Sequence, residues 1–154
     1  MITTNNRISA FIVLCFCTTI LFGCGQDELK PVELFPEDEC ANCKMTVSNP
    51  SFASEIISAN REVFKFDDLA CLETFRKKRT EIQIAAIFVK DYESKQWLPY
   101  ERSVLILTGI ETPMGSGKIA VRSNERAKIL AAEHPVKNIS ETIGKGCCTD
   151  SECE

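Results

Sequence analysis

The chain is poor in histidine, in aromatic residues and in excess positive charge. It has one His and 8% aromatic residues in 154 positions, and 18 Lys and Arg stand against 22 Asp and Glu. Nucleic-acid binding relies on clustered positive charge, so the absence of a long basic run disfavours a nucleic-acid ligand. The length, with 44% apolar and 26% charged residues, excludes a large multidomain enzyme and fits one or two small globular units.

Cysteine, by contrast, is abundant. Nine Cys in a chain of this size are unusual for a soluble intracellular domain without metal or redox chemistry. The function is therefore to be sought in the thiols.

An apolar run occupies residues 8–22, directly after Arg7. Its length suits a signal peptide and falls short of the ~20 residues that span a bilayer. The run ends in LFGC, and this ending resembles a bacterial lipobox, in which cleavage precedes the Cys and the thiol carries a diacylglycerol. The resemblance implies a signal peptide over residues 1–23 and a mature protein tethered to a membrane, outside the cytoplasm, through Cys24. The alternative is a short uncleaved anchor helix. Gly25 favours the outer membrane where a cell has two.

The sequence after the anchor predicts a tether followed by two similar units. Residues 25–39 contain two Pro and six acidic residues, which indicates that residues 24–39 are a flexible tether. The first unit covers residues 40–93, with strands at 45–47, 52–58, 62–66 and 82–89 and a helix that begins at Asp67-Asp68. The second covers residues 94–143, with strands at 103–107, 118–122 and 136–139 and a helix at 123–133. The predicted class is α+β, with two tandem strand-strand-helix-strand units that share or pack small antiparallel or mixed sheets.

The densest chemical signal is Cys40-x-x-Cys43-x-Met45. Soft sulfur donors suit Cu(I), which is satisfied by two or three of them, whereas zinc prefers four ligands. A thioredoxin-type dithiol normally opens a helix, but here an acidic tether precedes the motif and extended residues follow. A Cys40–Cys43 disulfide is the third possibility in an oxidising compartment. Metal binding, a disulfide and redox catalysis all remain open from the spacing alone.

Other sulfur atoms are possible additional ligands. Met114 lies in a Pro/Gly-rich loop between two predicted strands, where it either reaches a metal or fills a gap in the core. Cys71 is either a further thiolate or a buried residue of a capped helix. The tail at residues 144–154 has three more Cys. This tail is a second soft-metal site, a disulfide-linked end or a disordered segment. These are Cys147, Cys148 and Cys153.

Taken together, these motifs resemble the NosL family of copper-binding lipoproteins, accessory proteins for nitrous oxide reductase. The matching features include the lipobox, the Cys-x-x-Cys-x-Met motif, the Phe-Asp-Asp segment at 66–68 and the Pro-Met-Gly segment at 113–115. The resemblance implies a Cu(I) chaperone that works with an ABC-type membrane complex to supply the copper-sulfide centre of the reductase. It also implies a fold similar to part of organomercurial lyase. The family usually has Gly where this chain has Lys44, so the loop conformation is expected to differ.

The predicted function is that of a carrier without catalytic residues. Cys40, Cys43 and Met45 are the primary expected ligands of Cu(I), and a thioether neither titrates nor forms a disulfide. An exported thiol-disulfide oxidoreductase would use Cys40 and Cys43 and have no need of Met45. A lipoprotein stabilised only by disulfides is the remaining alternative.

Overall fold

The computed structural model describes residues 28–136 of the chain. The chain divides into two units, residues 1–30 and 31–154, and nearly all described residues belong to the second. The predicted signal peptide and the predicted tail at residues 144–154 lie outside the described residues. No helix within residues 28–136 is both long and apolar enough to cross a membrane.

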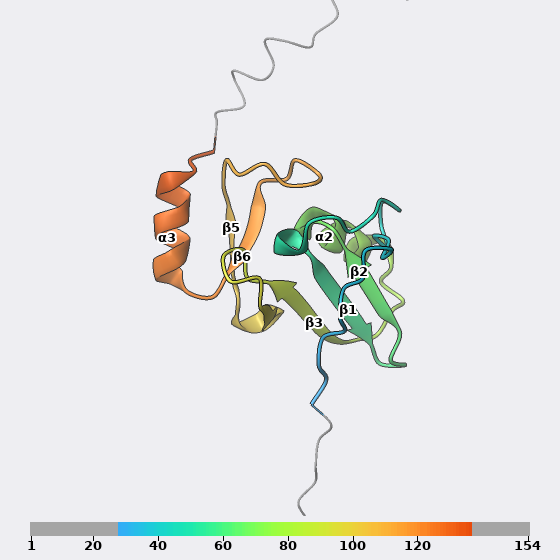
Figure 1. Ribbon diagram of the computed structural model, residues 1–154. Helices are drawn as coiled ribbons and strands as arrows, with labels where there is room; N and C mark the ends of the chain where they lie inside the picture. Colours follow the sequence, from blue (N-terminus) through green and yellow to red (C-terminus); the bar gives the residue numbers. More distant parts are fainter. Residues whose placement is uncertain (1–27, 137–154) are drawn as a thin grey trace, which may run out of the picture. The chain divides into compact units, whose positions relative to one another are not determined.

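A four-stranded antiparallel sheet forms the first half of the second unit (Figure 1). Its strands are β1 (Ser54–Ser58), β2 (Val63–Phe66), β3 (Ile84–Lys90) and β4 (Trp97–Pro99), in the order β2-β1-β3-β4. All residues of β1 are buried, because β1 pairs on both sides with other strands. The short connection between β1 and β2 contains a tight turn, in which Arg61 adopts a φ of 67°.

Helix α2 (Leu69–Lys78) packs against this sheet and begins at a polar cap. The Ala70 amide donates a 2.7 Å hydrogen bond to the Asp68 carboxylate, and three basic residues in the last turn complement the helix dipole. Buried Phe75 lies with its ring centroid 4.9 Å from that of Phe64 and 5.1 Å from that of Phe66. These aromatic contacts with β2 hold α2 next to the end of that strand.

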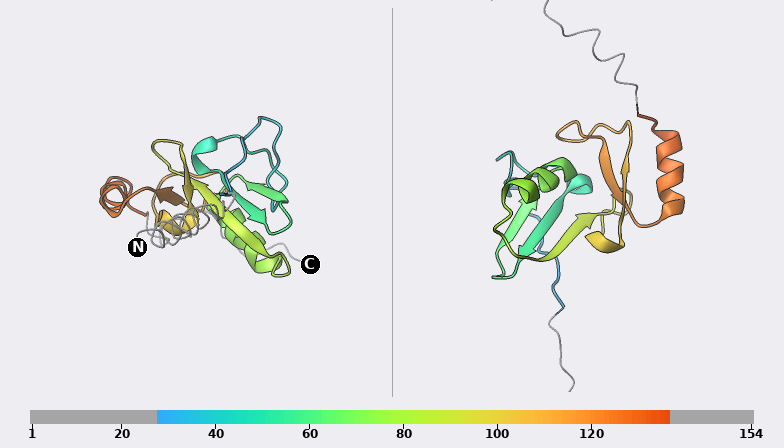
Figure 2. Two further views of the ribbon diagram at one scale, coloured as in Figure 1. Left: turned by 90° about the horizontal axis from the view of Figure 1, so that it is seen from below. Right: turned by 180° about the vertical axis from the view of Figure 1, so that it is seen from behind.

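A two-stranded sheet and one helix form the second half. The antiparallel strands are β5 (Val104–Leu107) and β6 (Lys118–Val121), and helix α3 (Asn124–Glu133) follows them. Ala127 and Leu130 of α3 share a small core with Ile119 and Val121 of β6. Figure 2 shows α3 beside the β5–β6 hairpin and α2 beside the larger sheet. The amide of Tyr92 joins the halves by donating a 2.9 Å hydrogen bond to the Ala120 carbonyl.

The predicted α+β class with small antiparallel sheets is confirmed, and the first half has the predicted strand-strand-helix-strand order. The second half shows strand, strand and helix. Its fourth element, a strand, is predicted at residues 136–139, of which the structure describes only Val136, and Val136 is not in a strand. Strand β4 lies in the sequence of the predicted second unit but pairs with β3, where Trp97 is opposite Lys90.

One predicted strand is absent, and another begins later than predicted. Residues 45–47 are not a strand, because Thr46 makes only an isolated bridge with Glu39 and the chain there closes a tight loop. The strand predicted from residue 52 begins only at Ser54, since Pro50–Phe52 is a 3-10 helix. Proline has no amide hydrogen to donate to a neighbouring strand and is well placed at the start of a helical turn.

Residues 31–39, predicted to belong to a flexible tether, are instead bound to the first sheet. The amide of Val32 donates a 2.9 Å hydrogen bond to the carboxylate of Glu55 in β1. The carboxylate of Asp38 forms a 2.6 Å ion pair with Lys65 in β2, and the carbonyl of Asp38 accepts a 2.8 Å bond from the Val47 amide. The folded unit therefore begins before residue 40, where the sequence had placed its boundary.

Candidate metal centre

The Cys-x-x-Cys motif lies on a tight loop that precedes the first sheet. The Lys44 amide donates a 2.9 Å hydrogen bond to the Cys40 carbonyl, and the Cys40 amide donates a 2.7 Å bond to the Met45 carbonyl. Closing this loop requires Lys44 to adopt a φ of 65°, a left-handed conformation that favours glycine. Lys44 thus adopts the backbone conformation that glycine, the residue usual in the family at this position, would take without strain.

A hydrogen bond fastens this loop to β2. The Ala41 amide donates a 2.8 Å bond to the Lys65 carbonyl. Strand β2 ends at Phe66, so Asp67 follows directly beside the loop, and Cys71 lies in the first turn of α2. Two elements that are distant in the sequence are thereby brought to one place.

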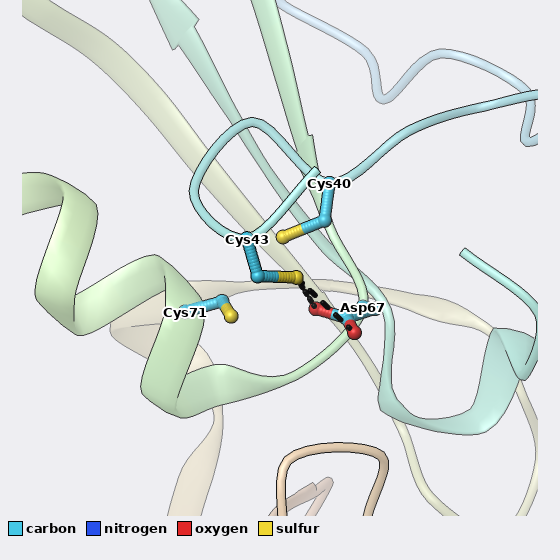
Figure 3. Close-up of side chains that lie close together, drawn as sticks. All are labelled: Cys40, Cys43, Asp67 and Cys71. Atoms are coloured by element: carbon cyan, nitrogen blue, oxygen red, sulfur yellow. Dashed lines mark hydrogen bonds between the residues drawn. The ribbon is translucent and has the colours of Figure 1, made fainter. Parts of the chain in front are cut away.

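Four side chains converge there, as Figure 3 shows. The Sγ atoms of Cys40, Cys43 and Cys71 and a carboxylate oxygen of Asp67 all lie within 4.8 Å of one another. The Cys43 thiol donates to the Asp67 carboxylate, with its Sγ 3.7 Å from each oxygen. We refer to these four residues as the thiol cluster.

The thiol cluster is closed to solvent on all but one side. Cys40, Cys71 and Asp67 are 0%, 2% and 1% exposed, whereas Cys43 is half-buried. The three cysteines are free thiols. Any ligand exchange with the outside would therefore begin at Cys43.

Burial sets the protonation of these thiols. Desolvation raises the pKa of Cys40 and, more strongly, that of Cys71, because a buried thiolate lacks the solvation of water. The Asn42 amide nitrogen, 3.5 Å from the Cys71 Sγ, opposes the shift in the pKa of Cys71 only in part. The metal-free thiols of Cys40 and Cys71 therefore hold their protons at neutral pH, and a metal must displace those protons to bind to these two residues.

The two predicted thioether ligands, Met45 and Met114, have exposed side chains. Met45 follows the loop and its side chain is 54% exposed, while that of Met114 is 43% exposed. The exposure of Met114 argues against the possibility that it fills a gap in the core. Its backbone amide donates a 3.1 Å hydrogen bond to the carboxylate of Asp68, the neighbour of Asp67.

The Cys-x-x-Cys spacing predicts that Cys40 and Cys43 lie together, whereas no motif of the sequence indicates that Asp67 belongs to the site. The sequence signal for Asp67 is the Asp67-Asp68 pair directly after a predicted strand, and this pair predicts a helix cap. Asp68 does cap α2, whereas Asp67 faces the thiols. Four predicted residues lie outside the described part of the chain and have no place in this geometry. They are the lipidation candidate Cys24 and the tail residues Cys147, Cys148 and Cys153.

The fold and the thiol cluster define a small α+β domain whose side chains are suited to a soft metal ion. The model of the NosL family matches residues 31–138, and the chain belongs to this family. Among solved structures, the copper chaperone NosL from Shewanella denitrificans is similar, with a TM-score of 0.61 and 15% sequence identity. The similarity covers 70% of this chain and 90% of that chain, and at this identity it shows a shared fold. No curated protein matches the sequence.

Proposed function

We propose that this protein is an extracytoplasmic Cu(I) chaperone, a carrier with no catalytic residues. The observation that carries the proposal is the convergence of three thiols within 4.8 Å. Cu(I) is a soft ion that two or three thiolate or thioether ligands satisfy. Membership of the NosL family and a fold shared with a protein described as a copper chaperone support the same metal.

The graded exposure of the sulfur atoms fits a carrier that must hold copper and then release it. Cys40 and Cys71 are buried and serve as anchors, whereas Cys43 is half-buried and Met45 is more than half exposed. An acceptor thiolate binds Cu(I) on the open side, the bond from copper to Cys43 breaks, and the freed thiolate takes up a proton. Copper keeps its oxidation state throughout, so no external oxidant or reductant is required.

The geometry does not favour the alternative of a thiol-disulfide oxidoreductase. Such an enzyme needs an accessible thiolate with a low pKa as its attacking nucleophile. Here burial raises the pKa of Cys40 and its side chain is fully buried, so Cys40 does not fit the role of that nucleophile. A third thiol and a carboxylate beside the pair also fit a ligand set better than a cycling dithiol.

The cellular location of the protein and the recipient of its copper are inferred from the sequence and from family membership. The lipobox places a diacylglycerol on Cys24, which tethers the protein to a membrane outside the cytoplasm, with outer-membrane sorting favoured where such a membrane exists. The recipient is the maturing copper-sulfide centre of nitrous oxide reductase, reached with an ABC-type membrane complex. Family membership supports this recipient.

Anaerobic Cu(I) titration of the reduced protein against a chromogenic chelator tests copper binding. Tight binding is expected in the wild type and in a tail variant carrying Cys147→Ser, Cys148→Ser and Cys153→Ser. It is expected to disappear in Cys40→Ser/Cys43→Ser and to weaken in Met45→Leu, which preserves size but removes the thioether. Binding that survives the Cys40/Cys43 variant and falls with the tail variant would contradict the proposed site.

Delivery is tested separately in cells that lack the protein. At limiting copper, nitrous oxide reductase isolated from those cells is expected to be deficient in copper at its copper-sulfide centre. Re-expression of the wild type restores the metal, and re-expression of Cys40→Ser/Cys43→Ser does not. Reductase with a full copper content in the deletion strain would overturn the recipient while leaving copper binding intact.

A further inference from the structure

Helix α2 ends in a run of four consecutive basic residues, all of them exposed. They are Arg76, Lys77, Lys78 and Arg79. We refer to them as the basic end of α2. Over residues 74–90 the sequence contains one acidic residue, Glu81. Cations in the last turn of a helix complement its dipole, but four neighbouring cations also repel one another. A surface of negative charge placed against this end would relieve the repulsion.

Part of this positive charge has no partner in the folded unit. Arg79 forms an ion pair with Glu81, and the guanidinium of Arg76 lies over an aromatic ring. Lys77 and Lys78 form no ion pair with any residue in the range 28–136. A chain with a net charge of -4 therefore presents free cations at one end of a rigid helix.

The folded unit begins close to the expected lipid anchor. Pro31 is its first residue, and Val32 is already fixed to Glu55 of β1. Cys24 and Pro31 are seven positions apart, so even a fully extended chain between them spans at most ~25 Å. A folded unit of about 100 residues has a radius of gyration of about 13 Å, so this tether is no longer than the unit is wide. A lipid on Cys24 therefore keeps some face of the unit at the membrane surface.

The basic end and the thiol cluster lie at opposite ends of α2. Cys71 is in the first turn of the helix and Lys78 is its last residue, which separates them by about 10 Å along the helix axis. Figure 3 shows Cys71 at the start of the helix, beside Cys43. A membrane in contact with the basic end would therefore leave the thiol cluster directed away from the lipid.

We propose that the basic end of α2 docks on anionic phospholipid headgroups of the membrane that holds the lipid anchor. Elsewhere in the described part of the chain, ion pairs with acidic residues neutralise Lys65, Lys118 and Arg126. A basic patch added to a lipid anchor is a second attachment to the membrane, and a second attachment fixes which face of the unit meets the lipid. The inference rests on the anchor in the proposed function, whereas copper binding has no part in it.

Vesicle binding of the unlipidated protein tests the basic end without the anchor. The mature chain carrying Cys24→Ser is sedimented with vesicles of phosphatidylcholine alone or of phosphatidylcholine mixed with phosphatidylglycerol. We expect binding to the anionic vesicles only, and we expect salt to weaken it. Lys77→Gln/Lys78→Gln should weaken this binding at least about tenfold, since each cation at an anionic membrane surface strengthens binding roughly fivefold.

Lys95→Gln/Lys128→Gln is the matched control, because it removes the same charge from two exposed lysines elsewhere on the protein. It should bind the anionic vesicles as the unsubstituted protein does. Equal losses in the two double variants would show that net charge alone is responsible and would overturn the proposal. Equal binding to neutral and anionic vesicles would overturn it as well.

The orientation is tested on the lipidated full-length protein in the anionic vesicles. An amine-acetylating reagent is added, and mass spectrometry follows each lysine. Compared with the protein in detergent, acetylation of Lys77 and Lys78 should slow, whereas that of Lys128 should not. Mass spectrometry of the same sample also reports the lipid on Cys24. A missing lipid would overturn the anchor alone, and a lipidated protein with unprotected Lys77 and Lys78 would overturn the docking alone.

Discussion

The backbone amide of Met114 donates a 3.1 Å hydrogen bond to the carboxylate of Asp68. Asp68 is fully buried and also accepts hydrogen bonds from the hydroxyls of Thr112 (2.6 Å) and Ser116 (2.7 Å). The same carboxylate caps α2 through Ala70. One side chain thus fastens the loop of the second half to the start of the helix that carries Cys71.

Replacing Asp68 by Ala should therefore destabilise the protein strongly. The helix loses its cap, which contributes about 1 kcal/mol to stability. Each buried hydrogen-bond donor that is left without the Asp68 carboxylate as acceptor costs roughly 1 kcal/mol or more. We expect a loss of about 3 kcal/mol or more, measured by urea unfolding. Ser123→Ala is the control, since Ser123 caps α3 through Arg126 without holding a second loop. Equal losses in the two variants would contradict the fastening role of Asp68.

Lys44→Gly should stabilise the metal-free protein. Lys44 has a φ of 65°, and left-handed backbone costs a residue with a side chain roughly 1 kcal/mol. Because glycine adds freedom to the unfolded chain, the net gain is smaller, about 0.5 kcal/mol. Thermal unfolding measures this gain in stability. Lys95→Gly is the control, because Lys95 also has a positive φ, of 58°, but lies away from the Cys-x-x-Cys motif. A loss of stability in Lys44→Gly would contradict this expectation.

The spacing of residues in the sequence predicts only part of the thiol cluster. Cys40 and Cys43 are three positions apart on one turn, so the sequence alone brings them together. Asp67 and Asp68 are equivalent as candidate helix caps, and only the packing of α2 on β2 decides which of them faces the thiols. The role of Cys71 depends on the same long-range packing, which no local pattern encodes.

The fold, like the site, was predictable from the sequence only in part. Alternating and helical patterns located β2, α2, β6 and α3, whose residues have regular apolar periods. Strand β4 has only the three residues Trp97–Pro99, too few for a period to be recognised. Residues 31–39 have the composition of a spacer, yet Asp38 pairs with Lys65 across the fold. Composition does not reveal such a long-range partner.

Glu55→Gln should stabilise the protein at pH 8 but not at pH 4. Glu55 is fully buried in β1, one of its oxygens accepts from Val32, and the other has no partner among the described residues. Burial raises the pKa of Glu55, and the charges of Lys65 and Lys90 oppose this only in part. A raised pKa means that stability is complete below the unfolded value near pH 4.3 and declines as pH rises. Neutral glutamine avoids this decline.

Thermal unfolding of Glu55→Gln at both pH values measures the difference from wild type. Glu55→Ala is the control, because it leaves the Val32 amide without its acceptor and should destabilise at both pH values. A gain in Glu55→Gln as large at pH 4 as at pH 8 would show that the charge of Glu55 is not its cause.

The buried thiols predict opposite pH dependences for the metal-free and the copper-loaded protein. Desolvation raises the pKa of Cys40 and of Cys71, so the folded metal-free protein binds those protons more tightly than the unfolded chain does. Its stability is complete below the unfolded value of roughly 8.5 and falls as pH rises further. Thermal unfolding between pH 8 and pH 10 should show this fall, and Cys40→Ser/Cys71→Ser should reduce it.

Copper binding should respond to pH in the other direction, because Cu(I) must displace the protons that the thiols hold. Competition titrations at pH 6, 7 and 8 are expected to give an affinity that rises with each step. Cys71→Ser removes one of the displaced protons, so its affinity should depend less steeply on pH than that of the wild type. Equal slopes in the two proteins would mean that Cys71 keeps its proton when copper binds, and the copper would then be held by Cys40 and Cys43 without it.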